Sequence, residues 1–436
     1  MPHGLSPQDH TTPAIHPTSS ARLAEFREQR FGLFIHWGLY ALAARHEWVK
    51  QRERLTDEQY QPYFDHFAPD LFDPDAWAEA AAGAGMRYMV LTTKHHDGFC
   101  LWDSAYTDYS VAHTPYGKDL VGPIVEAFRA RGLGVGFYHS LIDWHHPHFP
   151  IDGLHPAYVE GATTPDDRNI GQYQSYLHNQ VEELLTRYGR IDTMWFDFSY
   201  SKRVRNGTRT PGGKGAADWR SEELAAMVRR LQPDILINDR LEIPGDFTTP
   251  EQFQPPAPPA EVWEACQTLN GSWGYDRDNL DYKPVDLLVR MLIDTVAKNG
   301  NLLLNVGPNG RGAFEARALE SLRGIGAWTR LHGRSIYGAG PSTYEAPPDC
   351  RYTQRGDRLY VHLFAWPYKH LHLPGLAGKV RYAQLLNDAS EIRVLAPDPA
   401  VDSGHTKLGA LPPGTLTLQL PVQRPDVAVP VLELFL

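Results

Sequence analysis

The chain has 436 residues, of which 42% are hydrophobic and 22% charged, an ordinary globular composition with enough length for two domains. Its formal net charge is −10 and it contains no Lys/Arg-rich run, so a nucleic acid is excluded as an expected partner. The three cysteines, at positions 100, 266 and 350, are odd in number and far apart, which argues against a disulfide framework.

Residues 1–20 are polar and proline-containing, and they predict a flexible N-terminal tail. This segment lacks the basic start and the apolar core of a signal peptide. No window of about 18 apolar residues, the length needed for a membrane span, occurs in the chain. We therefore expect a cytoplasmic protein with no membrane partner.

Helical stretches alternate with short apolar runs from residue 21 onward. Strands are predicted over residues 31–36, 87–93, 133–139, 191–197, 234–239, 262–267 and 301–306. Helices are predicted over residues 21–29, 75–83, 120–131, 171–188, 221–231, 284–298 and 314–332. Seven strand-then-helix units in succession imply a parallel sheet with helical crossovers. An eighth such unit is hard to find in the sequence. The pattern predicts an α/β fold, a distorted (β/α)8-like barrel over residues 21–337.

The pattern of apolar and polar residues changes after Gly333. Apolar and polar residues alternate over short runs such as 359–364, 380–386 and 416–420. Pro and Gly punctuate these runs about every ten residues, as in antiparallel sandwiches. Residues 338–436 are therefore predicted to form a C-terminal antiparallel β-sandwich.

Polar side chains follow several of the predicted strands, at the end where α/β barrels carry their active sites. Asp197 ends an otherwise apolar strand, so its carboxylate needs donors nearby, and Trp195 lies on the same face of that strand. The carboxylate is either a catalytic nucleophile or base, or the N-cap of the following helix.

His95 and His96 follow the strand predicted over 87–93. They are candidates for metal ligands, for partners of sugar hydroxyls, or for structural histidines. Adjacent strand residues point to opposite faces, so both reach one site only where the strand has already become a loop. No HExxH or CxxC accompanies them, so no metal is expected. The cluster His145-His146-Pro147-His148 is a weaker candidate in a polar loop.

Two further carboxylates stand near a proline-rich loop. Glu251 begins this loop, which holds four prolines in residues 253–259, and Glu264 lies in the next strand. Retaining glycoside hydrolysis needs one carboxylate as nucleophile and one as acid and base. Taken alone, the pair is weak evidence in a chain with 52 acidic residues, and surface charge on a loop is the better interpretation without further context. The loops 199–218 and 253–259 both follow predicted strands and should overhang the active face.

A set of motifs resembles glycoside hydrolase family 29, the α-L-fucosidases. In chain order it consists of HWG at 36–38, EWV at 47–49, KHHDGF at 94–99, YHS at 138–140, DW at 143–144, WFD at 195–197, NDR at 238–240, GDFTTPEQ at 245–252, WEACQTLNGSWGY at 263–275 and NGNLLLNVGPNGRG at 299–312. The resemblance spans about residues 21–340 and implies a barrel followed by a β-sandwich.

The resemblance implies Asp197 as nucleophile and Glu251 as acid/base, with Glu264 as the alternative acid/base. It implies no metal and no organic cofactor. Trp273 is expected near the C6 methyl of fucose. The other implied contacts to the sugar come from residues His36, Glu47, Trp48, His95, His96, Tyr138, Trp195 and Arg240. The family's second tyrosine after Tyr138 is replaced here by His139.

The GDFTTPEQ element is most similar to the branch that acts on α-1,3 and α-1,4 linkages. The resemblance therefore implies a retaining exo-α-L-fucosidase whose partner is a fucosylated oligosaccharide or glycoconjugate. Alternatives are a broad-specificity enzyme acting on α-1,2, α-1,6 or aryl fucosides, a metal-dependent barrel hydrolase, and a catalytically silent sugar-binding protein. A homo-oligomer is left open.

Overall fold

A computed structural model describes residues 18–160, 167–202, 204–205, 208–209, 212–395 and 411–436. Most of the predicted tail, residues 1–17, lies outside this part of the chain, as does part of the 199–218 loop. The first helix, α1, spans Ser20–Gln29 and is capped by Ser19, whose hydroxyl accepts a hydrogen bond from the Arg22 N–H at 3.2 Å. The last residues of the predicted tail are therefore already ordered.

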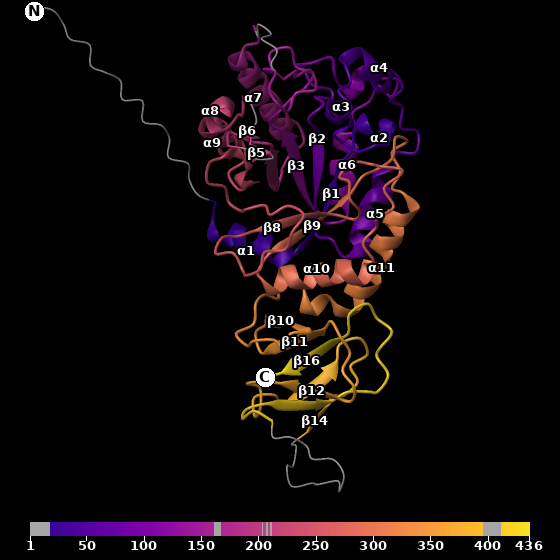
Figure 1. Cartoon of the computed structure of the whole chain (residues 1–436), viewed down its shortest axis with the longest axis vertical. Coiled ribbons are helices and arrows are strands. Elements are labelled where there is room, and N and C mark those ends of the chain that lie inside the picture. Colours follow the sequence, from indigo (N-terminus) through magenta and orange to yellow (C-terminus); the bar gives the residue numbers. More distant parts are fainter. Residues whose placement is uncertain (1–17, 161–166, 203, 206–207, 210–211, 396–410) are drawn as a thin grey trace, which may run out of the picture.

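The N-terminal part of the protein is built on one parallel sheet, and every predicted strand occurs in it (Figure 1). The order across the sheet is β7-β4-β3-β2-β1-β9-β8. The strands are β1 Phe31–Ile35, β2 Tyr88–Lys94, β3 Gly134–Ser140, β4 Thr193–Asp197, β7 Leu236–Ile237, β8 Glu264–Thr268 and β9 Asn301–Val306. Parallel pairing places all their carboxyl ends at one rim.

An irregular segment, residues 246–252, bridges the two edge strands β7 and β8. The Asp246 N–H donates to the Ile237 carbonyl at 2.7 Å, and the Glu264 N–H donates to the Thr248 carbonyl at 2.9 Å. Pro250 lacks an N–H, so the segment cannot form a full ladder. The segment thus takes the place of the eighth strand, and the prediction of a distorted barrel is confirmed.

Helices cover the outer face of the sheet. Those predicted from the sequence are α1, α5 Pro74–Ala84, α6 Val121–Ala130, α7 Ile170–Arg187, α9 Ser221–Leu231, α10 Val285–Ala297 and α11 Ala316–His332. Short helices add to the loops at the rim: α2 Tyr40–Ala43, α3 Val49–Arg52, α4 Asp57–Asp65 and α8 Ala216–Trp219. None of the helices in the described ranges is both long enough and apolar enough to cross a membrane.

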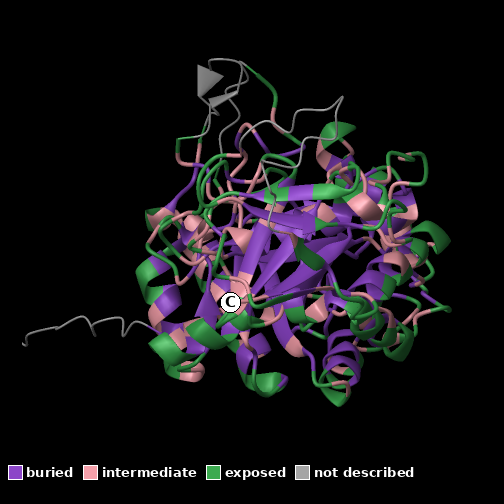
Figure 2. Ribbon diagram, turned by 90° about the horizontal axis from the view of Figure 1, so that it is seen from below, coloured by how far each residue is buried: buried purple, intermediate pink, exposed green. Residues whose placement is uncertain are grey.

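Alternation along the strands separates two apolar cores, because successive side chains point to opposite faces. Inside the barrel lie buried residues such as Phe34, Val90, Tyr138 and Trp195, together with Phe247 of the bridging segment. The intervening residues, among them Leu33, Met89, Phe137 and Met194, join the larger core beneath the helices. Figure 2 shows the buried strands at the centre of the molecule, with the exposed residues toward its periphery.

The C-terminal part consists of two antiparallel sheets. One has the order β10-β11-β16-β13 and the other β12-β15-β14. Their strands are β10 Cys350–Arg355, β11 Arg358–Leu363, β12 His370–Leu373, β13 Tyr382–Leu385, β14 Arg393–Leu395, β15 Leu416–Gln419 and β16 Val431–Phe435. Side chains from both sheets, including Leu359 and Leu418, share one core, so the predicted β-sandwich is confirmed.

The sandwich packs against the barrel helices α10 and α11, which lie between it and the barrel in Figure 1. The Trp328 Nε1–H of α11 donates to the Val429 carbonyl at 2.7 Å, and Arg351 of β10 donates to Asp294 of α10 at 2.8 Å. The exact division into residues 21–337 and 338–436 stays a prediction.

Candidate active site

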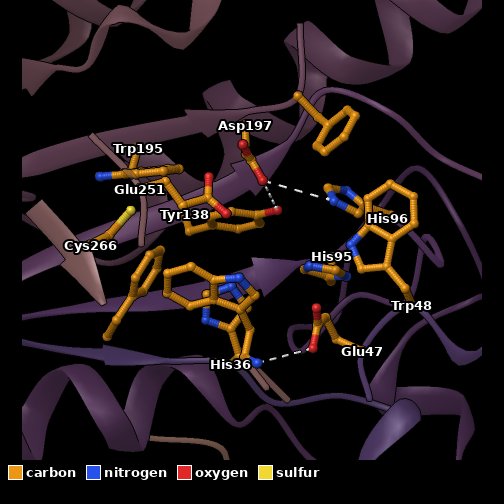
Figure 3. Close-up of a pocket in the computed structure, with 13 residues that line it drawn as sticks. His36, Glu47, Trp48, His95, His96, Tyr138, Trp195, Asp197, Glu251 and Cys266 are labelled. Carbon is orange, nitrogen blue, oxygen red and sulfur yellow. Dashed lines mark hydrogen bonds and ion pairs between the residues drawn. The ribbon is translucent and has the colours of Figure 1, made fainter. Parts of the chain in front are cut away.

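A pocket with an empty volume of about 350 Å³ opens at the carboxyl ends of the barrel strands (Figure 3). All the predicted site residues line it except Arg240 and Glu264. Its lining residues are Phe34, His36, Glu47, Trp48, His95, His96, Tyr138, Trp195, Asp197, Phe198, Glu251, Cys266 and Trp273.

Strand periodicity explains how these residues reach the pocket. Asp197 follows Trp195 by two positions on β4, so both side chains face the barrel interior. In the same way Cys266 follows Glu264 on β8, one interior layer nearer the pocket. Loops after the strands supply the remaining groups, including Glu47 and Trp48 after β1.

Asp197 lies at the centre of a hydrogen-bond network. Its Oδ2 accepts from the Tyr138 hydroxyl at 2.8 Å, and its Oδ1 accepts from Arg240 Nη1 at 3.1 Å. The Nε2 atom of His96 stands 3.8 Å from Oδ2. Burial raises the pKa of Asp197 to about 6, and the Glu251 charge raises it too, although Arg240 and the Tyr138 hydroxyl oppose the rise. A carboxyl group with a pKa of about 6 is mostly ionised at neutral pH.

Glu251 shares the same arginine. Arg240 Nη2 donates to Glu251 Oε2 at 3.0 Å, while its Nε donates to Thr249 Oγ1 at 2.7 Å. The guanidinium also lies over the Trp195 ring, 5.0 Å from its centroid. The Glu251 side chain is 42% exposed, against 14% for Asp197. One rigid cation thus bridges a deep carboxylate and a carboxylate at the rim.

Glu264 lies below the pocket and is fully buried. Its Oε2 accepts from the Tyr88 hydroxyl at 2.5 Å and its Oε1 from Trp195 Nε1 at 3.1 Å. Burial raises its pKa to about 7, against these two hydrogen bonds. Both oxygens are therefore engaged with the barrel interior.

The histidine pair meets at the pocket because β2 ends at Lys94. The ring centroids of His95 and His96 are 4.0 Å apart, which agrees with the expectation that both reach one site only beyond the strand. Within the described ranges, no group of three His, Cys, Asp or Glu side chains is arranged to hold a metal ion. His145 lies outside the pocket and stacks on Tyr109 at 3.7 Å.

Two charged residues of the KHHDGF motif support the loop from behind. Lys94 donates to Asp143 at 3.2 Å, and both side chains are almost fully buried. Asp97 accepts from the Tyr60 hydroxyl at 2.9 Å. His139, the departure from the family pattern, contacts Thr93 at 3.2 Å and does not line the pocket. The replacement therefore leaves the pocket lining intact.

Glu47 connects two sides of the pocket. Its Oε2 accepts from the backbone N–H groups of Trp273 at 3.2 Å and Gly274 at 2.9 Å. Burial raises its pKa to about 7, and the backbone donors oppose this rise. The Trp273 ring packs 5.2 Å from His36, and Trp48 meets His96 edge-on at 5.0 Å. The two tryptophans give the pocket apolar walls.

Sequence reasoning missed three lining residues, Phe34, Phe198 and Cys266. Strand periodicity could have predicted Phe34 and Cys266, since Phe34 lies two positions before His36 and Cys266 two positions after Glu264. Phe198 adopts a φ of 84°, a conformation that a bulky side chain rarely takes. Its ring packs 4.9 Å from His96, so this strained backbone directs an aromatic group into the pocket.

Comparison with known proteins agrees with this geometry. The sequence profile of the family described as Alpha-L-fucosidase matches residues 5–334. The chain belongs to the α-L-fucosidase family. The tissue alpha-L-fucosidase of Bos taurus is 30% identical over 377 residues, which cover 79% of this chain and 75% of the relative. The predicted glycoside hydrolase of the α-L-fucosidase family is thereby confirmed.

Solved structures of α-L-fucosidases share the whole architecture. Alpha-L-fucosidase isoenzyme 1 from Paenibacillus thiaminolyticus is 44% identical, with a TM-score of 0.86 over 95% of this chain and 98% of that one. A GH29 α-L-fucosidase from Bacteroides thetaiotaomicron, trapped as a covalent intermediate with 2-fluoro-fucosyl fluoride, is 27% identical. Its TM-score is 0.80, over 96% of this chain and 97% of that one.

Proposed function

We propose that this protein is a retaining exo-α-L-fucosidase in which Asp197 attacks the anomeric carbon and Glu251 is the acid/base. The bridge that Arg240 forms between the two carboxylates carries this proposal. Asp197 is deep and is held by hydrogen bonds from Tyr138 and Arg240, as a nucleophile must be, whereas Glu251 stands at the rim where a leaving group departs.

The two carboxylates take turns in the proposed reaction. The ionised Asp197 displaces the leaving oxygen, which receives a proton from Glu251, and a covalent fucosyl-enzyme forms. Glu251 then removes a proton from water, which attacks the same carbon and releases Asp197. The covalent intermediate trapped in the Bacteroides thetaiotaomicron relative supports this double displacement.

The contacts of Glu264 argue against it as the acid/base. Both of its oxygens are held by Tyr88 and Trp195, and its side chain has no exposure to the pocket. A substitution series tests the assignment. Glu251→Ala should cripple cleavage of a natural disaccharide while sparing the first step with an aryl leaving group of low pKa, since protonation matters most for poor leaving groups. Glu261→Ala, on the exposed part of the same loop, is the matched control.

The nucleophile has an independent test. Asp197→Gly should lower turnover by several orders of magnitude, and added azide should restore cleavage of an activated fucoside and yield β-fucosyl azide. Near-normal turnover without azide would reject Asp197. If Glu264→Ala rather than Glu251→Ala shows the leaving-group split, the acid/base assignment moves to Glu264.

The loop that carries Glu251 supports specificity for α-1,3/1,4 linkages. Gln267 donates to the Phe253 carbonyl at 3.1 Å, and Lys298 donates to the Pro255 carbonyl at 2.7 Å. The Phe253 side chain is 55% exposed beside the acid/base. A loop anchored in this way forms a preset wall for the aglycone and costs little ordering on binding.

Lewis-type α-1,3/1,4-fucosides should therefore be cleaved much faster than α-1,2-linked 2′-fucosyllactose, with weak activity on simple aryl fucosides. The kcat/KM values of these three substrates decide between the two specificities. Best activity on the α-1,2 linkage or on the aryl fucoside would favour the broad-specificity alternative. A protein that binds fucose but cleaves none of them would be the silent sugar-binding protein.

A further inference from the structure

Asn305 stands at the carboxyl end of β9, in the NGNLLLNVGPNGRG motif to which no role has been given so far. It lies two positions after Leu303, on the strand face that looks into the barrel, and its side chain is 2% exposed. Its amide makes two short hydrogen bonds. Nδ2 donates to the Trp273 carbonyl at 2.6 Å, and Oδ1 is 2.7 Å from His36 Nδ1.

These two contacts fix the proton on His36. The Trp273 carbonyl can only accept, so Asn305 must turn its NH₂ group toward it and its oxygen toward His36. That oxygen also only accepts, so the His36 proton resides on Nδ1. Burial lowers the pKa of His36 to about 3, and a neutral imidazole carries one N–H. The opposite nitrogen, Nε2, is therefore a lone-pair acceptor.

His36 lines the pocket, and no other residue in the described ranges is hydrogen-bonded to its Nε2. The ring proton of His96 is placed on Nδ1 by the same argument. The Ser140 hydroxyl donates to the Ile142 carbonyl at 2.6 Å, so it accepts from His96 Nδ1 at 2.7 Å. Both histidines are thus hydrogen-bonded through Nδ1.

The second contact of Asn305 concerns the position of Trp273. A hollow with an empty volume of about 300 Å³ lies behind the loop of residues 272–275, and Asn305, Ser272 and Gly274 line it. Polar contacts hold the backbone of this loop. Glu47 holds its backbone N–H groups from one side, and Asn305 holds the Trp273 carbonyl from the other.

We propose that Asn305 is a positioning residue for the fucosidase reaction. It presents His36 Nε2 as the acceptor of a sugar hydroxyl hydrogen and holds Trp273 against the same sugar. This inference rests on the proposed function, because it assumes that the pocket binds fucose. Asn305 itself touches neither the substrate nor the reacting atoms.

Asn305→Asp tests the proton assignment. The new carboxylate still accepts from His36 Nδ1, but its charge stabilises the imidazolium and raises the pKa of His36. Once protonated, Nε2 donates and can no longer accept a hydroxyl hydrogen. The acid side of the log kcat/KM profile should therefore steepen from a slope of about one to about two, because a second group must lose its proton.

Asn301→Asp is the matched control. Asn301 lies on the same strand and is also fully buried, but its Nδ2 donates to the Phe26 carbonyl at 2.7 Å, at the opposite end of the barrel. Its substitution should lower thermal stability and leave the pH profile of the folded enzyme unchanged. If the Asn305→Asp and Asn301→Asp profiles are parallel, the inference is wrong.

Asn305→Ala covers the case in which the aspartate variant does not fold. It should lower kcat/KM on a fucoside about 10- to 100-fold, mostly through KM, without moving the acid limb. Fucose binding measured by calorimetry should weaken in parallel. A variant with lowered melting temperature but unchanged kcat/KM and fucose affinity would overturn the inference. If the unsubstituted protein cleaves no fucoside, the proposed function fails instead.

Discussion

The hydroxyl of Tyr138 should set the pH at which the enzyme loses activity in acid. It donates to Asp197 at 2.8 Å, and this hydrogen bond lowers the pKa of a carboxylate that burial raises to about 6. A hydrogen bond to a charged group contributes about 1.5–3 kcal/mol. At about 1.4 kcal/mol per pKa unit, Tyr138→Phe should raise the pKa of Asp197 by about one to two units.

The sign follows from the role of the group. A nucleophile must be ionised, so a higher pKa means that activity disappears at a higher pH as the solution is acidified. The acid limb of kcat/KM should move from about pH 6 to about pH 7–8, and activity at pH 5 should fall about 10- to 100-fold beyond any loss at alkaline pH. The assay is kcat/KM for an activated fucoside between about pH 4 and pH 9.

Tyr60→Phe is the control for this experiment. Tyr60 donates to Asp97 at 2.9 Å, and burial raises the pKa of this second carboxylate to about 6 as well, although it does not line the pocket. If the acid limb moves with Tyr60→Phe and not with Tyr138→Phe, the acid limb is set by Asp97, which supports the loop. Our reasoning about Asp197 is then refuted.

Other consequences of the structure are open to test. Lys94→Met leaves Asp143 buried without its cation and should cost about 3–5 kcal/mol of unfolding free energy, against less than about 1 kcal/mol for Arg45→Met in an exposed ion pair. Denaturant unfolding measures both, and equal losses would contradict the argument. Because the pKa of Asp143 is lowered from 3.8 to about 2, mainly by Lys94 acting against burial, its contribution should be complete above about pH 4 and should fade as the pH falls toward 2. Acid unfolding curves should therefore differ between the wild type and Lys94→Met. Prolonged EDTA treatment should leave the rate of fucoside cleavage unchanged, and an enzyme that EDTA inactivates and Zn²⁺ restores would favour the metal-dependent hydrolase.

The strand pattern of this chain was readable from the sequence because each strand is short, apolar and bounded by turn residues. The bounds of β1 to β4 differ from the predicted ones by at most two residues at either end, and those of β9 are as predicted. Strand periodicity also predicted that Trp195 and Asp197 share a face, since the side-chain period of two is local. The sandwich followed from the same local alternation.

Long-range contacts decided the rest. The segment 246–252 has no strand pattern of its own, and its pairing with β7 and β8 places Glu251 at the rim. Glu264, on a neighbouring strand, lies one layer deeper, where Tyr88 and Trp195 engage it. The sequence named both glutamates, but it could not reveal their depth, because depth depends on the stagger between strands.

The sequence by itself determined which residue types gather at the carboxyl ends of the strands, because that arrangement depends on local alternation and chain order. The tertiary structure alone decided which of them face one another. Lys94 and Asp97 share a motif with His95 and His96, yet they serve as supports, since their partners come from other elements, Asp143 from the loop after β3 and Tyr60 from α4. In the same way, the contacts of Asn305 with His36 and Trp273 join residues 269 and 32 positions apart in the chain, a separation that no local pattern records.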